Sequence, residues 1–332
     1  MQQARAFSVA VSLVALLYGA VGYALLPQAA FEGDLTRMAM LPEQLFGWTR
    51  PQPAVAQGEV RQHSLAQADV LVIGDSFSTP LIWQISLHRE GWKVRTEHWD
   101  NLRGVCADLG AFLTSQGFRG RRVVLQVVER NLERVLDESL RCTSTRYRLK
   151  QQVDASPGMP AASHDRQHPH RDGRMSVGIR SQVNGWRHQW WTAATDLRSW
   201  QVTANVRVTK VEGGCAKFSH PACRDALFFA EDAAADLPLD EVRRMADVAE
   251  RLKPWKVTWV VVPNKSTVYL HPDKQFWQVA QARLGAPDLL RMTQHALEIG
   301  HVDLYPGNNT HFSTEGYQLM GELVRGAMLT QP

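Results

Sequence analysis

The sequence has little net charge of either sign and no block of lysine or arginine. Its 37 basic and 33 acidic residues leave a formal net charge of +4 over 332 residues, and the basic residues are scattered along the chain. Proteins that bind nucleic acid concentrate positive charge on one face or in one segment, because phosphate contacts supply much of their affinity. No nucleic-acid partner is therefore expected. A hydrophobic content of 44% with 21% charged residues is instead that of a globular protein.

Cysteine is also scarce. The four cysteines, Cys106, Cys142, Cys215 and Cys223, include no pair at the close CxxC spacing of common zinc sites, so no metal is expected. No cofactor is expected. Their even number suits an oxidising compartment. Cys215 and Cys223 flank the short segment CAKFSHPAC and are the easiest pair to close, which leaves Cys106–Cys142 by elimination. Four reduced, buried cysteines are the alternative.

Long apolar runs are missing except at the N-terminus. Residues 6–26 (AFSVAVSLVALLYGAVGYALL) carry no charge, and a helix of this length, at about 1.5 Å per residue, just spans a bilayer core. Arg5 before the run, with Glu32 and Asp34 after it, favours an N-terminus on the inner side. A cleaved signal peptide and a buried core helix are the alternatives. The run is longer than a usual signal-peptide core and lacks a clean cleavage site, so residues 1–30 are expected to form an anchor that exports the rest.

The remainder of the chain is typical of one α/β domain preceded by a linker. Residues 31–66, interrupted by three prolines, are expected to form a stalk, and residues 67–332 the folded domain. Apolar, β-branched runs alternate there with helical segments, which indicates a flavodoxin-like parallel sheet covered by helices. Thr79 followed by Pro80 predicts a helix directly after the first strand. The expected strands are residues 70–73, 92–99, 121–130 and 257–263.

A long interruption separates the two halves of this domain. Residues 153–174 are rich in proline, glycine, serine, histidine and charge, and are expected to form a mobile loop with solvated histidines. Residues 175–235 are expected to form an insertion beside the main sheet. Within it, residues 199–211 (SWQVTANVRVTKV) alternate like a strand with one exposed face.

Two segments contain the candidate catalytic residues. VLVIGDSFSTP at residues 70–80 leaves Ser76 at the tip of a strand, and PGNNTHFSTEGY presents His311 before a helix that Ser313 or Thr314 would cap. Both points belong to the carboxyl edge of a parallel sheet, where open α/β sheets place their sites. Serine needs an adjacent base to act as a nucleophile, and imidazole supplies one near neutral pH. The alternatives are a serine that only ends a buried strand and a surface histidine.

These motifs together resemble a known superfamily. GDSFS and NNTHFSTEGY, with VVLQVVERNLERVL at residues 123–136, VVPNKSTVYLHP at residues 261–272 and an N-terminal anchor, are similar to the SGNH (GDSL-type) hydrolases. Within that superfamily they look most like the alginate O-acetyltransferase (AlgJ/AlgX-like) branch. The resemblance covers roughly residues 67–150 and 240–328 and implies an SGNH-type α/β fold.

The resemblance implies a serine acyl-enzyme. Ser76 takes the place of the nucleophile and His311 that of the general base. Gly104, in NLRGVCAD, stands where the superfamily has an oxyanion-hole glycine, and its backbone N–H would act with that of Ser76. Asn131, at the end of the third strand, is the candidate to complete the hole.

The resemblance also implies a polymeric substrate. Glu129, Arg130, Lys265 and Tyr269 fit positions near the polysaccharide. The implied activity is O-acetylation of an exopolysaccharide, such as cellulose or alginate, in the periplasm, by an enzyme anchored to the inner membrane through residues 6–26. A membrane-bound acyltransferase would relay the acetyl group, because acetyl-CoA is not expected there.

One departure from the family concerns the third catalytic residue. Related sequences place an aspartate two or three residues before the histidine, where this chain has Asn309 and Asn308. Asparagine orients an imidazole but does not offset its positive charge. Asp303 is the nearest acid upstream and the candidate substitute. Two other functions stay open: a polysaccharide acetyl-esterase that uses the same residues, and a non-catalytic polysaccharide-binding scaffold, which the two asparagines favour.

Overall fold

The computed structural model describes residues 2–25, 32–56, 58–145, 175–194, 198–232 and 236–330. The segment expected to be a mobile loop, residues 153–174, lies outside this part. The chain divides into two compact units. The anchor unit comprises residues 1–49, 163–230 and 306–309, and the parallel-sheet unit comprises residues 50–162, 231–305 and 310–332.

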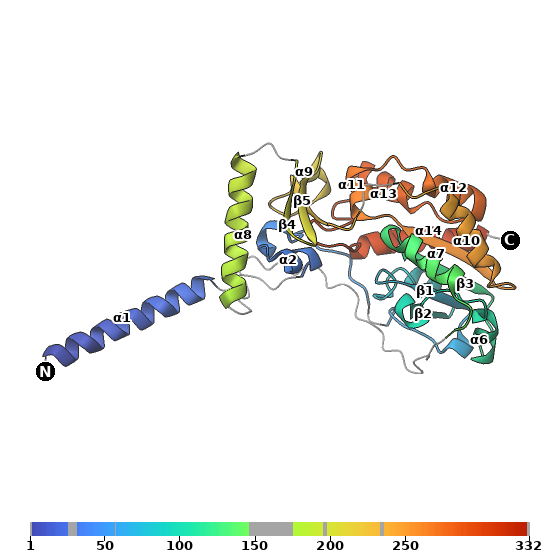
Figure 1. The fold of residues 1–332 in the computed structure, drawn as a ribbon, viewed down its shortest axis with the longest axis horizontal. Coiled ribbons are helices and arrows are strands. Elements are labelled where there is room, and N and C mark those ends of the chain that lie inside the picture. The colour runs from blue at the N-terminus through green and yellow to red at the C-terminus, as the bar shows by residue number, and fades with distance from the viewer. Residues whose placement is uncertain are drawn as a thin grey trace. The chain divides into compact units, whose positions relative to one another are not determined.

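A four-stranded parallel sheet forms the centre of the parallel-sheet unit (Figure 1). Its strands are β1 (Val70–Gly74), β2 (Val94–His98), β3 (Arg122–Val128) and β7 (Lys256–Val262), in the order β2-β1-β3-β7. All three pairings are parallel. The strands are rich in buried valine because both faces of the sheet are covered. The predicted strands and the α/β class with a helix-flanked parallel sheet are confirmed.

Helices of the parallel-sheet unit connect and cover these strands. The last helix, α14, packs on α4, α13 and β7, whereas α7 packs on β3 and α10. The bounds are α4 (Ile85–Arg89), α5 (Trp99–Leu102), α6 (Leu109–Ser115), α7 (Leu132–Arg141), α10 (Asp240–Glu250), α11 (Lys265–Leu270), α12 (Phe276–Leu284), α13 (Leu289–Glu298) and α14 (Thr314–Thr330), with short 3-10 turns η1 (Leu65–Gln67) and η2 (Glu129–Asn131).

The first helix after β1 begins later than predicted. Helix α4 starts at Ile85, so Thr79 and Pro80 do not begin a helix. Leu81 takes a left-handed conformation with a φ of 61°, and its N–H donates to the Ser78 carbonyl at 3.2 Å. A residue with positive φ does not continue a right-handed helix, so the chain turns here before α4 can form.

The anchor unit contains a second, antiparallel sheet. Strands β4 (Ser199–Thr203), β5 (Val206–Lys210) and β6 (Asp225–Phe229) pair in that order, so residues 199–211 form a hairpin rather than the single expected strand. The two residues between the paired ends, Ala204 and Asn205, make the turn. Beyond it lies α9 (Gly214–Lys217), next to the Cys215–Cys223 disulfide. This unit also contains the long helix α8 (Met175–Ala194).

The segment expected to be a stalk is folded in its first part. Helices α2 (Asp34–Ala39) and α3 (Glu43–Phe46) lie in residues 31–49. Leu35, Ala39 and Phe46 are fully buried in one cluster with Val206, Val208 and Leu227 of the second sheet, and Met38 and Leu45 pack against it partly buried. Pro42 only separates two short helices, and burial of their apolar side chains keeps the segment folded.

The N-terminus forms one long apolar helix, α1 (Gln2–Leu25). Residues 3–22 are long and apolar enough to cross a membrane, and none of that window is buried against the protein. The two disulfides, Cys106–Cys142 and Cys215–Cys223, pair as expected from the sequence. An apolar N-terminal helix suggests a signal segment or an anchor, and disulfides suggest an exported protein.

Candidate functional site

Ser76 and His311 meet at the carboxyl edge of the parallel sheet. Ser76 follows β1 by two residues, and His311 precedes α14 by three. The Ser76 Oγ and the His311 Nε2 lie 2.8 Å apart, within hydrogen-bond distance. Both residues are half-buried. The structure therefore brings together the two residues that the sequence predicts as a pair.

Asp75 holds the turn that presents Ser76. Its Oδ1 accepts hydrogen bonds from the Phe77 N–H at 3.0 Å and from the Gln126 Nε2 at 2.9 Å. Its Oδ2 accepts from the Val128 N–H at 2.6 Å. One buried carboxylate thus ties the end of β1 to the end of β3. Sequence reasoning missed this role, because a strand pattern places adjacent side chains on opposite faces and says nothing of the turn beyond it.

Gln126 and Gly74 complete the support under the turn. The Gln126 Oε1 accepts from the Asp75 N–H at 3.1 Å and from the Ser78 Oγ at 2.7 Å. A Cβ on Gly74 would lie 2.2 Å from the Ser78 Oγ and 2.8 Å from the Gln126 Oε1. Only glycine fits at this position, because the polar network fills the space that a side chain would need.

Phe77 packs against the imidazole of His311. The two ring centroids are 4.9 Å apart, and Phe77 also contacts Phe312 edge-on at 5.6 Å. Phe77 and Phe312 are fully buried. Because the turn that carries Ser76 also carries this aromatic contact, one local structure places both the hydroxyl and the ring that faces it. Sequence reasoning did not single out Phe77.

The other nitrogen of His311 faces a hydroxyl. The Nδ1 lies 3.1 Å from the Oγ1 of Thr310. For Nε2 to accept the proton of Ser76, the neutral ring must carry its proton on Nδ1, and Thr310 then accepts it. A hydroxyl orients the imidazole but supplies no negative charge to the imidazolium.

The structure shows contacts of the predicted third members, whose catalytic role stays a prediction. Within the anchor unit, the Asn308 Nδ2 donates to Glu43, and the backbone N–H of Asn309 donates to the Pro306 carbonyl at 3.1 Å. Asp303 is fully buried in the parallel-sheet unit. Burial raises the pKa of Tyr269, and the charge of nearby Asp303 raises it further.

Glu43 is itself an unusual carboxyl group. It is 2% exposed, and its oxygens accept from the Gly33 N–H at 3.3 Å and from the Thr36 Oγ1, besides the Asn308 amide. Burial raises its pKa from 4.5 to about 7. Asn308 therefore supports a buried carboxyl group of the anchor unit, a role that the sequence did not indicate.

We expect Glu43 to make stability depend on pH. The pKa of Glu43 is about 7 in the folded chain, above the ordinary value of 4.5. Between these two pH values the folded chain keeps a proton on Glu43 that the unfolded chain has lost. Stability therefore falls as pH rises, by roughly 3 kcal/mol at about 1.4 kcal/mol per pKa unit. The melting temperature should fall from about pH 5 to about pH 7.5. Glu43→Gln should flatten this slope, and Glu59→Gln, at an exposed carboxylate, should not. Equal slopes in all three proteins would contradict the prediction.

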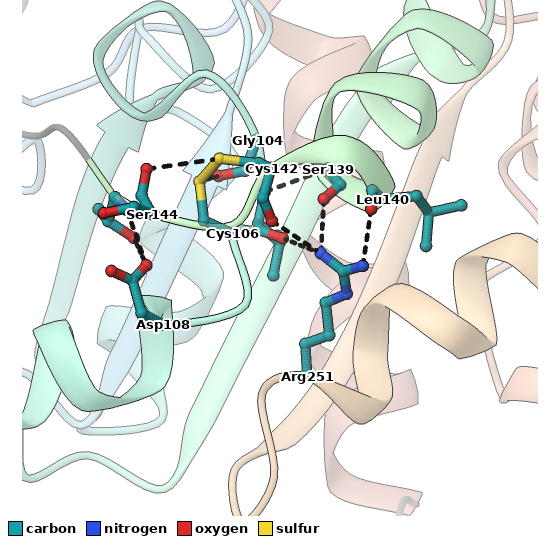
Figure 2. Close-up of a disulfide and its surroundings, with 10 residues drawn as sticks. Gly104, Cys106, Asp108, Ser139, Leu140, Cys142, Ser144 and Arg251 are labelled. Atoms are coloured by element: carbon teal, nitrogen blue, oxygen red, sulfur yellow. Dashed lines mark hydrogen bonds between the residues drawn. A yellow bond between two sulfur atoms is a disulfide. The ribbon is translucent and has the colours of Figure 1, made fainter.

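Gly104 lies beside the Cys106–Cys142 disulfide (Figure 2). It has a φ of 118°, and a Cβ there would lie 2.9 Å from the Ser139 N. Ser139 belongs to the last turn of α7, about 10 Å along the helix from its start at the end of β3. No hydrogen bond between Gly104 and Ser76 is present among the described residues, and the role of Gly104 in an oxyanion hole stays a prediction. A glycine is required here for close packing against α7 and for the positive φ.

Arg251 lies at the C-terminal end of α7, beside the same disulfide (Figure 2). Its guanidinium donates to the carbonyls of Ser139 at 2.6 Å, Leu140 at 2.8 Å and Cys142 at 3.2 Å. These carbonyls lie at the C-terminal end of α7, in its last residues and its C-cap Cys142, where helix carbonyls lack the usual N–H partner four residues further on. A cation at a helix C-terminus also offsets the helix dipole. The disulfide and Arg251 together fix the far end of α7.

Glu129 lies in a buried network rather than in an open substrate site. Its Oε2 accepts from the Asn264 N–H at 2.8 Å and from the Thr267 Oγ1 at 2.6 Å, and its Oε1 accepts from the Lys274 Nζ at 2.7 Å. The side chains of Glu129 and Lys274 are only 3% and 2% exposed. The network joins the end of β3 to the segment after β7, and Lys274 was not foreseen from the sequence.

Two more of the expected substrate residues are buried. Lys265 is 1% exposed, and the Tyr269 hydroxyl donates to the Tyr305 carbonyl and accepts from the Tyr305 N–H, both at 3.2 Å. Side chains so enclosed do not reach a polymer.

Arg130 is the one member of that group with an exposed portion. Its side chain is 14% exposed and donates through Nη1 to Asp232 at 3.1 Å and to the Asn264 Oδ1 at 3.4 Å. Burial raises the pKa of Asp232, which the positive charge of Arg130 opposes. The guanidinium is therefore held at the carboxyl edge of the sheet by a buried carboxylate.

Two groups at the edge are suited to stabilise an oxyanion. Among the described residues, the Ser76 N–H has no hydrogen-bond acceptor, and the half-buried Asn131 side chain has no hydrogen-bond partner. Asn131 ends η2, directly after β3. Donors with no acceptor of their own are what a developing negative charge requires.

The described residues contain no group of three or more histidine, cysteine, aspartate or glutamate side chains arranged to hold a metal ion. No protein-family model, curated protein or solved structure matches this chain. The hydrogen-bonded serine and histidine, at the edge of a parallel sheet, are thus the feature from which a function is argued.

Proposed function

We propose that this chain is a serine acyltransferase that moves acetyl groups to hydroxyls of an exopolysaccharide. The observation that carries the proposal is the 2.8 Å contact between the Ser76 Oγ and the His311 Nε2. A serine hydroxyl is a weak nucleophile until an adjacent base accepts its proton, and neutral imidazole is the usual base. The resemblance of the surrounding motifs to SGNH-type O-acetyltransferases supports the choice of acetyl group and sugar.

The reaction has two balanced halves. In the first, the Ser76 Oγ attacks the carbonyl carbon of an acetyl donor while His311 takes the hydroxyl proton. The bond to the leaving group breaks, and the leaving group takes the proton from His311. In the second, a sugar hydroxyl gives its proton to His311 and attacks the acetyl-enzyme, and Ser76 regains a proton. The N–H of Ser76 and the amide of Asn131 are the proposed oxyanion donors in both halves.

The site chemistry is compatible with water as an acceptor as well. Ser76 is half-buried rather than enclosed, which favours hydrolysis as the second candidate. The proposed setting for transfer is the periplasmic face of the inner membrane, with a membrane-bound acyltransferase as the acetyl donor. The apolar helix α1 and the two disulfides support an exported, membrane-attached chain.

The test is intact mass spectrometry of the full chain in detergent micelles. The protein is incubated with 4-nitrophenyl acetate, and cello-oligosaccharides or mannuronate oligomers are then added. We expect the mass of one acetyl group on the wild-type protein, absent from Ser76→Ala and passed to the sugar. Thr79→Ala is the matched control, because Thr79 is an exposed hydroxyl of the same turn.

Three other results would contradict the acyltransferase proposal. An adduct that is lost only to water would assign the chain as an esterase. An adduct that survives Ser76→Ala would show that another nucleophile reacts. Absence of both an adduct and ester turnover, combined with oligosaccharide binding that survives Ser76→Ala, would identify a polysaccharide-binding scaffold.

A further inference from the structure

Helix α8 exposes its large apolar side chains to solvent. Ile179, Val183, Trp186 and Trp190 are 39%, 42%, 62% and 68% exposed. Apart from α1, the exposed large hydrophobic residues elsewhere in the described part of the chain are only Leu239, Ile299 and Leu329, which stand singly. Isolated exposed hydrophobics are ordinary, whereas a continuous row of them marks an interaction surface.

The opposite face of α8 packs on the anchor unit with small and polar residues. Ser181, Gly185 and His188 are buried. A Cβ on Gly185 would lie 2.8 Å from the Pro42 Cγ, so the helix approaches α3 closely. The imidazole of His188 stacks on Trp200 with centroids 5.3 Å apart. This distribution is the reverse of that in an ordinary surface helix, which buries its apolar stripe.

The exposed residues form one narrow stripe. At about 100° per residue, positions 179, 183, 186 and 190 fall within roughly 60° around the helix axis. Arg180 and Arg187 border one side of the stripe, and both are exposed. The sequence of α8 contains no acidic residue. An apolar stripe with tryptophans and bordering arginines is the pattern of a helix that lies in the interface of a bilayer.

We propose that the stripe of α8, formed by Ile179, Val183, Trp186 and Trp190, lies in the surface of the membrane that α1 enters. Helix α1 belongs to the same unit and contacts α8, so the chain itself holds this surface near a bilayer. Tryptophan prefers the headgroup region, and arginine attracts anionic lipids. The anchor unit is thereby attached twice, by a spanning helix and by a helix in the interface. This inference is independent of the proposed acyl transfer.

Tryptophan fluorescence tests the proposal, because α1 contains no tryptophan. The full chain is reconstituted in vesicles of phosphatidylcholine with a minority of phosphatidylglycerol, with or without bromine on the acyl chains. Bromolipid should quench part of the emission of the wild-type protein. Trp186→Phe combined with Trp190→Phe should remove most of the quenched part, whereas Trp255→Phe, in the parallel-sheet unit, should leave it unchanged.

A water-soluble quencher separates the other outcomes. Acrylamide should not quench Trp186 and Trp190 when the protein is in vesicles. If Trp186 and Trp190 are quenched by acrylamide and not by bromolipid in vesicles, the stripe faces water and the proposal fails. If they are shielded from both quenchers, a protein partner or a second copy covers the stripe, and the membrane assignment is overturned.

Discussion

Replacing His311 by glutamine should lower the rate of Ser76 acetylation by roughly four orders of magnitude or more, as loss of the base does in other serine enzymes. The hydroxyl of Ser76 lies 2.8 Å from the His311 Nε2. Glutamine keeps a polar side chain of similar reach but does not accept a proton at neutral pH, so the serine stays a weak nucleophile. The measurement is the initial rate of nitrophenol release from 4-nitrophenyl acetate with the full chain in detergent.

His301→Gln is the matched control for this substitution. His301 lies in the same unit and its Nδ1 is 2.7 Å from Glu315, so it is also a hydrogen-bonded histidine near α14. We expect its variant to acetylate within a few-fold of the wild-type rate. Equal rates for His311→Gln and the wild-type protein would show that His311 is not the base, and a large loss in His301→Gln would point to a general effect on folding.

Replacing Asp75 by alanine should cost roughly 3–5 kcal/mol of folding stability, the usual cost of removing one partner from a buried charged network. Three donors lose their acceptor: the N–H groups of Phe77 and Val128, and the Nε2 of Gln126. Loss of so large a part of a typical total of about 5–15 kcal/mol should lower the urea midpoint strongly. The turn that presents Ser76 should also lose its geometry, and activity should fall in whatever fraction stays folded.

Asp69→Ala provides the comparison. The Asp69 Oδ2 also accepts a backbone N–H, that of Lys93 at 2.9 Å, but at an exposed position. Water replaces the lost acceptor there, so we expect a cost below about 1 kcal/mol. Similar urea midpoints for Asp75→Ala and Asp69→Ala would mean that the network under Ser76 contributes no more than a surface contact.

Much of the site edge was predictable because it follows from local patterns. A β-branched run that ends at Gly74 predicts β1, and a capping serine predicts the start of α14. Parallel strands then require the segments that follow β1 and precede α14 to lie at one edge. Ser76 and His311 could therefore be paired without knowledge of the strand order, which long-range packing decides.

The supporting residues could not be predicted in the same way. Asp75 and Gln126 act across a separation of 51 residues, and their hydrogen bonds depend on the register of β1 with β3. Gly104 was assigned to the site from its motif, although its neighbours come from the far end of α7. The three prolines of residues 31–66 predict a stalk, whereas the sheet that buries apolar side chains of residues 34–46 comes more than 150 residues later.

The buried pair of Glu129 and Lys274 has a consequence for the evolution of this sequence. The two side chains lie 2.7 Å apart with almost no exposure, so the loss of either alone leaves the other in the interior without this opposite charge. Tolerated changes should therefore arrive as double substitutions, and in an ancestral or diverged lineage the two positions should change identity together. Such paired change, more than the short Gly-Asp-Ser motif, would allow distant relatives to be traced when overall similarity has been lost.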